Sequence, residues 1–237
     1  MTQAIAPKIR VSEIFGPTIQ GEGQLIGKPT VFVRSGGCDF RCDWCDTLYA
    51  VEPQFKDQWQ AMSASDIMQQ IVELAGAPLL VTLSGGNPAL QPFGALIELG
   101  QAQGYQFSIE TQGSIHKDWF SLLDMLVLSP KPPSSGMQND WCKVAQCIEV
   151  AQRADISFKI VVADDADFAF ARDVQLRFPN YPFSLQACNP NPDSDSSIEQ
   201  ILQRQRWLTE KVCSEKWYNV GVLPQLHALL WGNQRGV

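Results

Sequence analysis

Continuous apolar runs alternate with helix-periodic stretches along most of this chain, and no other feature restricts its fold as strongly. The runs have the short, uninterrupted character of strands buried on both faces, as in a parallel sheet covered by helices. They predict strands over residues 29–34, 79–83, 105–111, 125–129, 156–163, 182–187 and 217–223. Helices are predicted over about 63–74, 140–153, 166–177 and 197–213, with another ending near Leu99. We therefore expect an α/β fold.

The rest of the chain reads as connections within one unit. Residues 8–15 suggest a short strand or edge segment, and 16–23 a glycine-punctuated loop. Residues 50–62 look irregular, 189–197 form a loop rich in Asn, Pro, Asp and Ser, and a helical turn closes the chain. Without a repeat or interdomain linker, the sequence predicts a single domain over residues 1–237.

Nearly every predicted strand ends in polar or glycine-rich residues. These ends lie at 34–47, 84–88, 110–113, 129–131 and 186–189. In α/β barrels the carboxyl ends of the strands share one mouth, where the chemistry is built. The strand count favours a partial, open (β/α) barrel of six or seven mostly parallel strands over a closed eightfold one.

Composition excludes several function classes. Apolar residues make up 45% and charged residues 18% of the 237 residues, as in globular proteins. A net charge of −7 disfavours a broad surface for nucleic acid or anionic membranes. Seven cysteines form no regular disulfide framework, and the N-terminus lacks a signal-peptide pattern. We expect a reduced, cytoplasmic protein.

Three cysteines, Cys38, Cys42 and Cys45, lie within eight residues at C-x3-C-x2-C spacing. A [4Fe–4S] cluster held by three thiolates leaves one iron open to a ligand that is not protein. A zinc site would need a fourth ligand, and the two histidines, His116 and His227, form no second knuckle. Disulfide formation or simple burial as small apolar residues are the remaining alternatives.

Other strand ends offer ligand contacts, each with a plain structural alternative. Gly85 and Gly86 let the backbone approach a ligand, or simply make a tight turn. Arg34 suits a carboxylate, Thr47 offers an oxygen to Mg²⁺, and Gln20 with Glu22 suits an amide–amino edge such as that of guanine. A turn or capping role for Glu22 competes with this function. Glu110 and Lys131 are candidates for polar contacts; a charge such as Glu110 just past a strand end is often only solvated, whereas the prolines after Lys131 stiffen its backbone. Cys142, Cys147, Cys188 and Cys213 read mainly as buried small residues.

The cysteine spacing with Trp44 resembles the signature of the radical S-adenosylmethionine (SAM) superfamily. The Gly85-Gly86-Asn87-Pro88 segment is similar to that superfamily's Gly-Gly-Glu-Pro motif, with Asn87 in the place of the commoner glutamate. Further segments extend the resemblance to the family of 7-carboxy-7-deazaguanine synthases over nearly the whole chain. They are residues 15–23, 38–47, 84–90, 110–113, 129–135 and 223–227.

The resemblance implies a lyase that converts 6-carboxy-5,6,7,8-tetrahydropterin to 7-carboxy-7-deazaguanine with loss of ammonia, on the route to queuosine and other 7-deazapurines. An adenosyl radical would take a hydrogen from the carbon that bears the carboxylate and later return it, so SAM would be regenerated. The resemblance also implies Mg²⁺, a one-electron donor such as flavodoxin, and a homodimer.

Site residues are carried over from the same resemblance. Cluster ligation falls on Cys38, Cys42 and Cys45, and Mg²⁺ binding on Thr47. SAM contacts fall on Trp44, Cys45, Asp46, Gly86, Ser129, Pro130, Lys131, Gln186, Ala187, Cys188 and Asn189. Substrate contacts fall on Ile19, Gln20, Gly21, Glu22, Arg34, Ser84 and His227. Some relatives use a terminal carboxylate on the substrate, and the role of Val237 stays open.

Two other functions compete with this one. A radical-generating activase of a partner protein predicts an exposed mouth and stoichiometric consumption of SAM. A zinc-stabilised binding module predicts no catalysis, and zinc without iron or sulfide.

Overall fold

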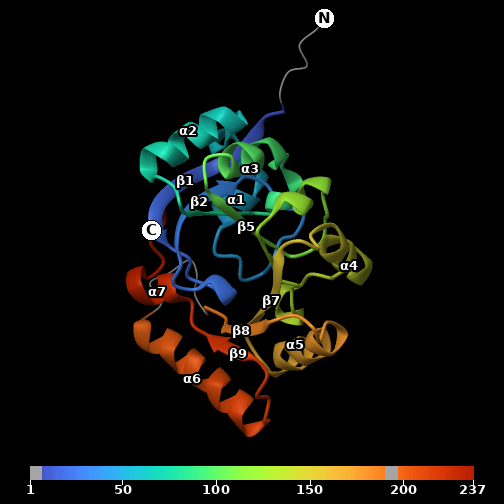
Figure 1. Ribbon diagram of the computed structural model, residues 1–237. Coiled ribbons are helices and arrows are strands. Elements are labelled where there is room, and N and C mark those ends of the chain that lie inside the picture. Colours follow the sequence, from blue (N-terminus) through green and yellow to red (C-terminus); the bar gives the residue numbers. More distant parts are fainter. Residues whose placement is uncertain (1–6, 190–196) are drawn as a thin grey trace, which may run out of the picture.

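The computed structural model describes residues 7–189 and 197–237. Within these ranges, nine strands form one sheet in the order β3-β1-β2-β4-β5-β6-β7-β8-β9 (Figure 1). The strands are β1 (Ile9–Ile19), β2 (Pro29–Ser35), β3 (Gln60–Met62), β4 (Leu80–Gly85), β5 (Gln106–Thr111), β6 (Met125–Leu128), β7 (Asp155–Val162), β8 (Phe183–Ala187) and β9 (Gly221–Leu223). The predicted loop over 189–197 lies mostly outside the described residues.

Helices lie outside the sheet, with α2 and α3 at the top of Figure 1 and α5 and α6 at the bottom. They are α1 (Leu48–Val51), α2 (Ala64–Leu74), α3 (Gly94–Gln101), α4 (Trp141–Val150), α5 (Asp165–Arg177), α6 (Ile198–Ser214) and α7 (Leu226–Trp231). The predicted capping box of α2 is present: the Ser63 hydroxyl accepts from the Asp66 N–H, and Asp66 accepts from the Ser63 N–H.

Seven strands, β2 and β4 to β9, pair in parallel with one another. They correspond to the seven apolar runs that the sequence predicts as strands. Their alternate side chains face opposite sides. Phe107, Ile109, Phe158 and Ile160 belong to the large core beneath the helices. The opposite, inner face carries a small apolar cluster of Leu25, Leu80, Met125 and Val127, and polar side chains near the strand ends. The polar side chains at the strand ends therefore come together on this inner face.

Strand β1 corrects the predicted loop over residues 16–23. It runs antiparallel to β2 as far as Ile19, with a register shift between Phe15 and Thr18. Pro17 has no N–H to donate to the ladder, and it lies within this irregular stretch. Pairing with β2 therefore resumes after Pro17. The true loop begins at Gln20, whose N–H donates to the Lys28 carbonyl at 2.8 Å. A short 3₁₀ turn, Gly23–Leu25, then places buried Leu25 in the inner cluster.

Two further predictions need correction. Residues 50–62, expected to be irregular, contain a 3₁₀ helix (Pro53–Gln58) and β3, which pairs antiparallel with Ile9–Val11. The last strand is shorter than predicted, because the Trp217 N–H donates to the Val212 carbonyl at 3.0 Å and so closes α6. None of the helices in the described ranges has the length and apolarity to span a bilayer.

Candidate active site

One cavity of about 260 Å³ lies at the carboxyl ends of the central strands. It brings together most of the predicted site residues, which come from the β1–β2 loop, the cysteine loop, several strand ends and the C-terminal segment. Those lining it are Ile19, Gln20, Gly21, Glu22, Arg34, Cys38, Cys42, Trp44, Cys45, Asp46, Thr47, Ser84, Gly86, Lys131, Asn189 and His227. The prediction of one composite mouth is confirmed in this respect.

Five predicted residues lie behind this lining. Cys188 faces a smaller neighbouring cavity of about 100 Å³. Gln186 is fully buried in β8 and donates from Nε2 to the Pro224 carbonyl at 2.9 Å. Ala187, Ser129 and Pro130 are also buried, and the Ser129 hydroxyl accepts from Lys131 Nζ at 3.2 Å. These five residues are therefore placed to support the side chains that line the cavity.

The three cysteine thiols face the cavity from the loop that follows β2. Burial raises the pKa of all three, that of Cys42 to about 11, against a smaller lowering by Lys131. Three thiols on one loop at the cavity wall match the three thiolates of a [4Fe–4S] cluster that keeps one iron open. A closed zinc site would need a fourth protein ligand.

Asp39 anchors the cysteine loop to the two neighbouring strand ends. Its carboxylate accepts from Asn87 Nδ2 and from Gln112 Nε2, both at 2.8 Å. Gln112 also donates to Cys38 Sγ at 3.7 Å. Asn87 is fully buried and uses its whole amide, donating also to Ser114 Oγ and accepting from the Thr111 hydroxyl and the Ala89 N–H. Asn87 is thus a support for the loop.

We expect Asn87→Glu, which places the superfamily's commoner residue here, to destabilise the protein by about 2–4 kcal/mol. The new carboxylate would face Asp39 and remove both amide donors. Urea unfolding of the cluster-free protein measures the change. Adding Asp39→Asn should recover part of the loss, and Asn87→Glu unfolding at the wild-type midpoint would contradict this role.

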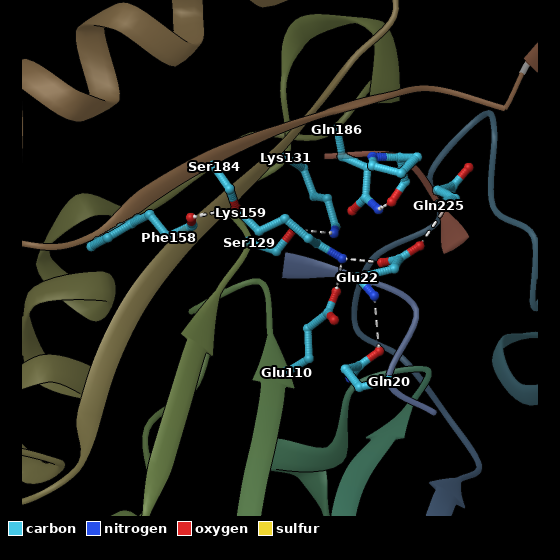
Figure 2. A network of polar contacts seen from close by, with 11 residues as sticks. Gln20, Glu22, Glu110, Ser129, Lys131, Phe158, Lys159, Ser184, Gln186 and Gln225 are labelled. Atoms are coloured by element: carbon cyan, nitrogen blue, oxygen red, sulfur yellow. Dashed lines mark hydrogen bonds and ion pairs between the residues drawn. The ribbon is translucent and has the colours of Figure 1, made fainter. Parts of the chain in front are cut away.

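A buried ion-pair network lies at the cavity wall. Lys159 Nζ contacts both Glu22 Oε2 and Glu110 Oε1, and Gln225 Nε2 donates to Glu22 Oε1 at 2.7 Å (Figure 2). The Glu22 N–H donates to Gln20 Oε1 at 3.2 Å. Burial alone would raise the pKa of Glu22, but Lys159, with help from His227, lowers it to about 2. Glu22 is therefore an ionised acceptor at the cavity wall.

Glu22 should make the fold sensitive to acid. Its pKa in the folded state, about 2, lies below the unfolded value of 4.5, so its contribution is present above pH 4.5 and is lost as pH falls toward 2. Urea unfolding of the cluster-free protein at about pH 6, 4 and 3 tests this. Wild type should lose more stability over that window than Glu22→Gln, and equal losses would contradict the shift.

Arg34 reaches the cavity but is held by neighbours that sequence reasoning missed. Its Nε donates to Glu13 Oε1 at 2.7 Å, and its guanidinium lies 5.5 Å from the Phe15 ring centroid. Glu13 also accepts from the Tyr49 hydroxyl at 2.8 Å and from Arg235 Nε at 3.0 Å. Burial would raise the pKa of Glu13, but Arg34 and these hydrogen bonds lower it. The guanidinium is thus oriented before any ligand enters.

The C-terminal segment closes one side of the cavity. Arg235 lies 3.7 Å from the Tyr49 ring centroid, and Asn233 accepts from Asn189 Nδ2 at 2.9 Å. Residues 232–237 line the cavity, Val237 included, and the C-terminus lies beside β1 in Figure 1. The role of Val237 was left open by the sequence, and the structure places this residue at the cavity.

Trp44, Asp46 and Thr47 flank Cys45 along the same wall. Trp44 Nε1 donates to Ser134 Oγ at 2.9 Å, and Lys131 Nζ lies 5.9 Å from the Trp44 ring centroid. Ligand atoms of Asp46, Glu22 and His227 lie within 4.8 Å of one another. Thr47 Oγ1 is 3.7 Å from Cys45 Sγ. Asp46 and Thr47 therefore offer oxygen atoms, the ligands that a hard cation such as Mg²⁺ prefers, next to Cys45.

One buried polar atom in the lining is unsatisfied. Ser84 Oγ has no hydrogen-bond partner among the described residues, although it is shielded from solvent. Such an atom fits a site that a polar ligand completes.

Lys159, Glu13 and Gln112 contact site residues, and sequence reasoning gave them no role. Lys159 lies within β7, Glu13 within β1, and Gln112 just past the end of β5. Lys159 had a usable signal, because a lysine inside an otherwise apolar strand needs a buried partner.

Comparison with known proteins supports these observations. The profile described as "Radical SAM superfamily" matches residues 32–128. A 7-carboxy-7-deazaguanine synthase of Bacillus cereus is 44% identical over 97% of this chain and 99% of its own length. The Bacillus subtilis protein of that name is 43% identical over 98% of this chain and 100% of its own length.

Solved structures are similar in fold. The crystal structure of QueE from Escherichia coli has a TM-score of 0.68 at 23% identity, over 93% of this chain and 95% of that chain. A structure titled "Native anSMEcpe with bound AdoMet" has a TM-score of 0.53 at 15% identity, over 86% and 67% of the two chains. These likenesses support the fold, and with the radical SAM profile match they confirm the predicted partial barrel of radical SAM type.

Proposed function

Because the chain belongs to the 7-carboxy-7-deazaguanine synthase family of radical SAM enzymes, we propose that it converts 6-carboxy-5,6,7,8-tetrahydropterin to 7-carboxy-7-deazaguanine with loss of ammonia. This lyase reaction lies on the route to queuosine and other 7-deazapurines. Its cofactors are a [4Fe–4S] cluster, SAM and Mg²⁺. The observation that carries the proposal is one cavity that holds the three cysteines and an ionised carboxylate, Glu22.

Cys38, Cys42 and Cys45 would hold the cluster, which when bound would supply one-electron chemistry to SAM. Asp39, through Asn87 and Gln112, fixes the loop that carries the three cysteines. Trp44, Asp46, Gly86 and Lys131 form the neighbouring wall of the cavity, and we assign SAM to this wall. Thr47 supplies an oxygen to Mg²⁺. Holding SAM and substrate in one small cavity brings the reacting atoms together.

Glu22 and Gln20 recognise the amide–amino edge of the pterin. Glu22 is an acceptor for the ring N–H and amino groups, and Gln20 is held beside it through the Glu22 N–H. Arg34 is oriented by Glu13 and has further N–H donors for the substrate carboxylate. Ser84 offers an unpaired hydroxyl, and His227 lies next to Glu22.

Product analysis tests the proposal. The reconstituted protein is incubated anaerobically with dithionite, SAM, Mg²⁺ and the carboxypterin. We expect 7-carboxy-7-deazaguanine in amounts that exceed the SAM consumed. No product from protein with a full cluster would overturn the proposal. An activase would instead consume SAM stoichiometrically, and the cavity closed by residues 232–237 favours a small molecule over a protein segment.

The assembly and setting follow from the same proposal. Residues 1–237 act as one radical SAM domain, supported by the single sheet of the described strands. A one-electron donor such as flavodoxin reduces the cluster, and two copies form a homodimer. A cytoplasmic location suits the seven free cysteines and an oxygen-sensitive cluster.

A further inference from the structure

Lys159 is a charged residue in the interior of the sheet. It lies in β7, between the inward positions Ser157 and Val161, and the exposed fraction of its side chain is 3%. The neighbouring outward residues, Phe158 and Ile160, pack in the large core. Lys159 therefore points to the inner face, toward the β1–β2 loop and the end of β5 (Figure 2).

The stem of Lys159 lies near Gly23 and Val127. A Cβ atom at Gly23 would lie 3.7 Å from both the Lys159 Cδ and the Val127 Cγ1. Burying an ammonium is costly, and apolar replacements of buried ion pairs are often neutral or stabilising. Packing alone thus gives no reason for a cation here, and its role must come from the groups that it contacts.

We propose that Lys159 is a positioning residue that fixes the Glu22 carboxylate for recognition of the pterin's amide–amino edge. The inference rests on the proposed function. Lys159 occupies Glu22 Oε2 and Gln225 occupies Oε1, one hydrogen bond to each oxygen. Each carboxylate oxygen has a second lone pair, and Glu22 lines the cavity. Lys159 therefore holds the side chain from behind while leaving acceptors for the ligand.

Glu110 is the second partner and explains how the cation is held in place. Its carboxylate, at the end of β5, contacts the same Nζ from another direction. Lys159 and Glu110 lie on the strands β7 and β5, whereas Glu22 lies on the loop between β1 and β2. The two strands therefore position the loop through the Lys159 ammonium. Removing the ammonium would leave two carboxylates at this wall without a shared cation, and Glu22 would turn away.

The test compares two ligands, because a structural defect alone would weaken both. Cluster-loaded protein with SAM and no reductant is titrated calorimetrically with 6-carboxytetrahydropterin, and with the lumazine analogue that has a carbonyl in place of the 2-amino group. The variants are Lys159→Met, Glu110→Gln and the double variant Lys159→Met/Glu110→Gln, which keeps Glu22 as the sole charge of the network. Lys211→Met removes the remote pair with Asp165 (2.7 Å) and is the matched control.

We expect wild type and Lys211→Met to prefer the pterin by about 10- to 100-fold, the range of a hydrogen bond to a charged group. The double variant should lose most of that preference relative to Glu110→Gln, which retains the Lys159–Glu22 pair. Lys159→Met should behave in the same way if it folds, and the double variant decides if it does not. If the double variant still prefers the pterin as strongly as wild type does, the inference about Lys159 is overturned and the proposed function is not. Failure of wild type to bind the pterin would overturn the proposed function with it.

Discussion

Replacing Cys42 with alanine will leave a folded protein that retains little iron and makes no deazapurine. The Cys42 side chain is small and lies at the cavity wall, so its loss should cost the fold about 1 kcal/mol or less. Under the proposed function its thiolate is one of three cluster ligands, and the two that remain would not retain the cluster. Iron and sulfide analysis with circular dichroism measures both effects.

The matched control is Cys147→Ala. Cys147 is fully buried in α4, with its thiol near the Gly113 and Ile115 carbonyls at 3.8 and 3.5 Å. This variant should lose stability but keep its iron. Global unfolding of Cys42→Ala would instead indicate a structural metal.

Replacing Gly86 with alanine will destabilise the protein by about 3 kcal/mol or more and loosen the cluster. A Cβ atom at this position would lie 2.3 Å from the Gly37 carbonyl oxygen and 2.9 Å from that of Ala50. Both obstacles are backbone, so β4 and the cysteine loop would have to separate. That separation would also weaken the Asn87 N–H bond to the Gly37 carbonyl, now 2.8 Å.

Gly76→Ala is the control, because nothing lies within 4 Å of an added Cβ there. It should change the free energy of unfolding by less than about 1 kcal/mol, the usual range for exposed positions. Urea unfolding and the rate of iron loss to a chelator measure both variants. A Gly86→Ala protein that matches Gly76→Ala in both would contradict the close packing.

The sequence predicts the architecture well because its strands carry their own signal. A continuous apolar run such as 79–83 can be buried on both faces only in a covered sheet, so the period and length of the runs settle the class. The capping box at Ser63 is equally local. The errors lie where pairing overrides local chemistry. Gly16-Pro17 is typical of a loop, yet Thr18 and Ile19, which follow it, pair with β2.

The site divides in the same way. The cysteines are close in sequence, and the parallel strand ends share one edge, so their meeting could be predicted. Lys159 contacts residues 137 and 49 positions away. Arg34 pairs with Glu13, and Arg235 joins them from 222 positions away. No local pattern encodes such pairs, since each depends on which loops fold over the sheet. Sequence therefore locates the mouth of the site but not the ion pairs that orient its residues.

The affinity of SAM for the protein with and without its iron is the most direct test of the whole account. Anaerobically reconstituted protein is divided, one half is stripped with a chelator, and both are titrated with SAM by calorimetry. We predict that stripping weakens SAM binding by about 100-fold or more, because an iron without a protein ligand would be the partner of SAM's amino and carboxylate groups. Equal affinity in the two halves would contradict an active site built on three cysteines and one open iron.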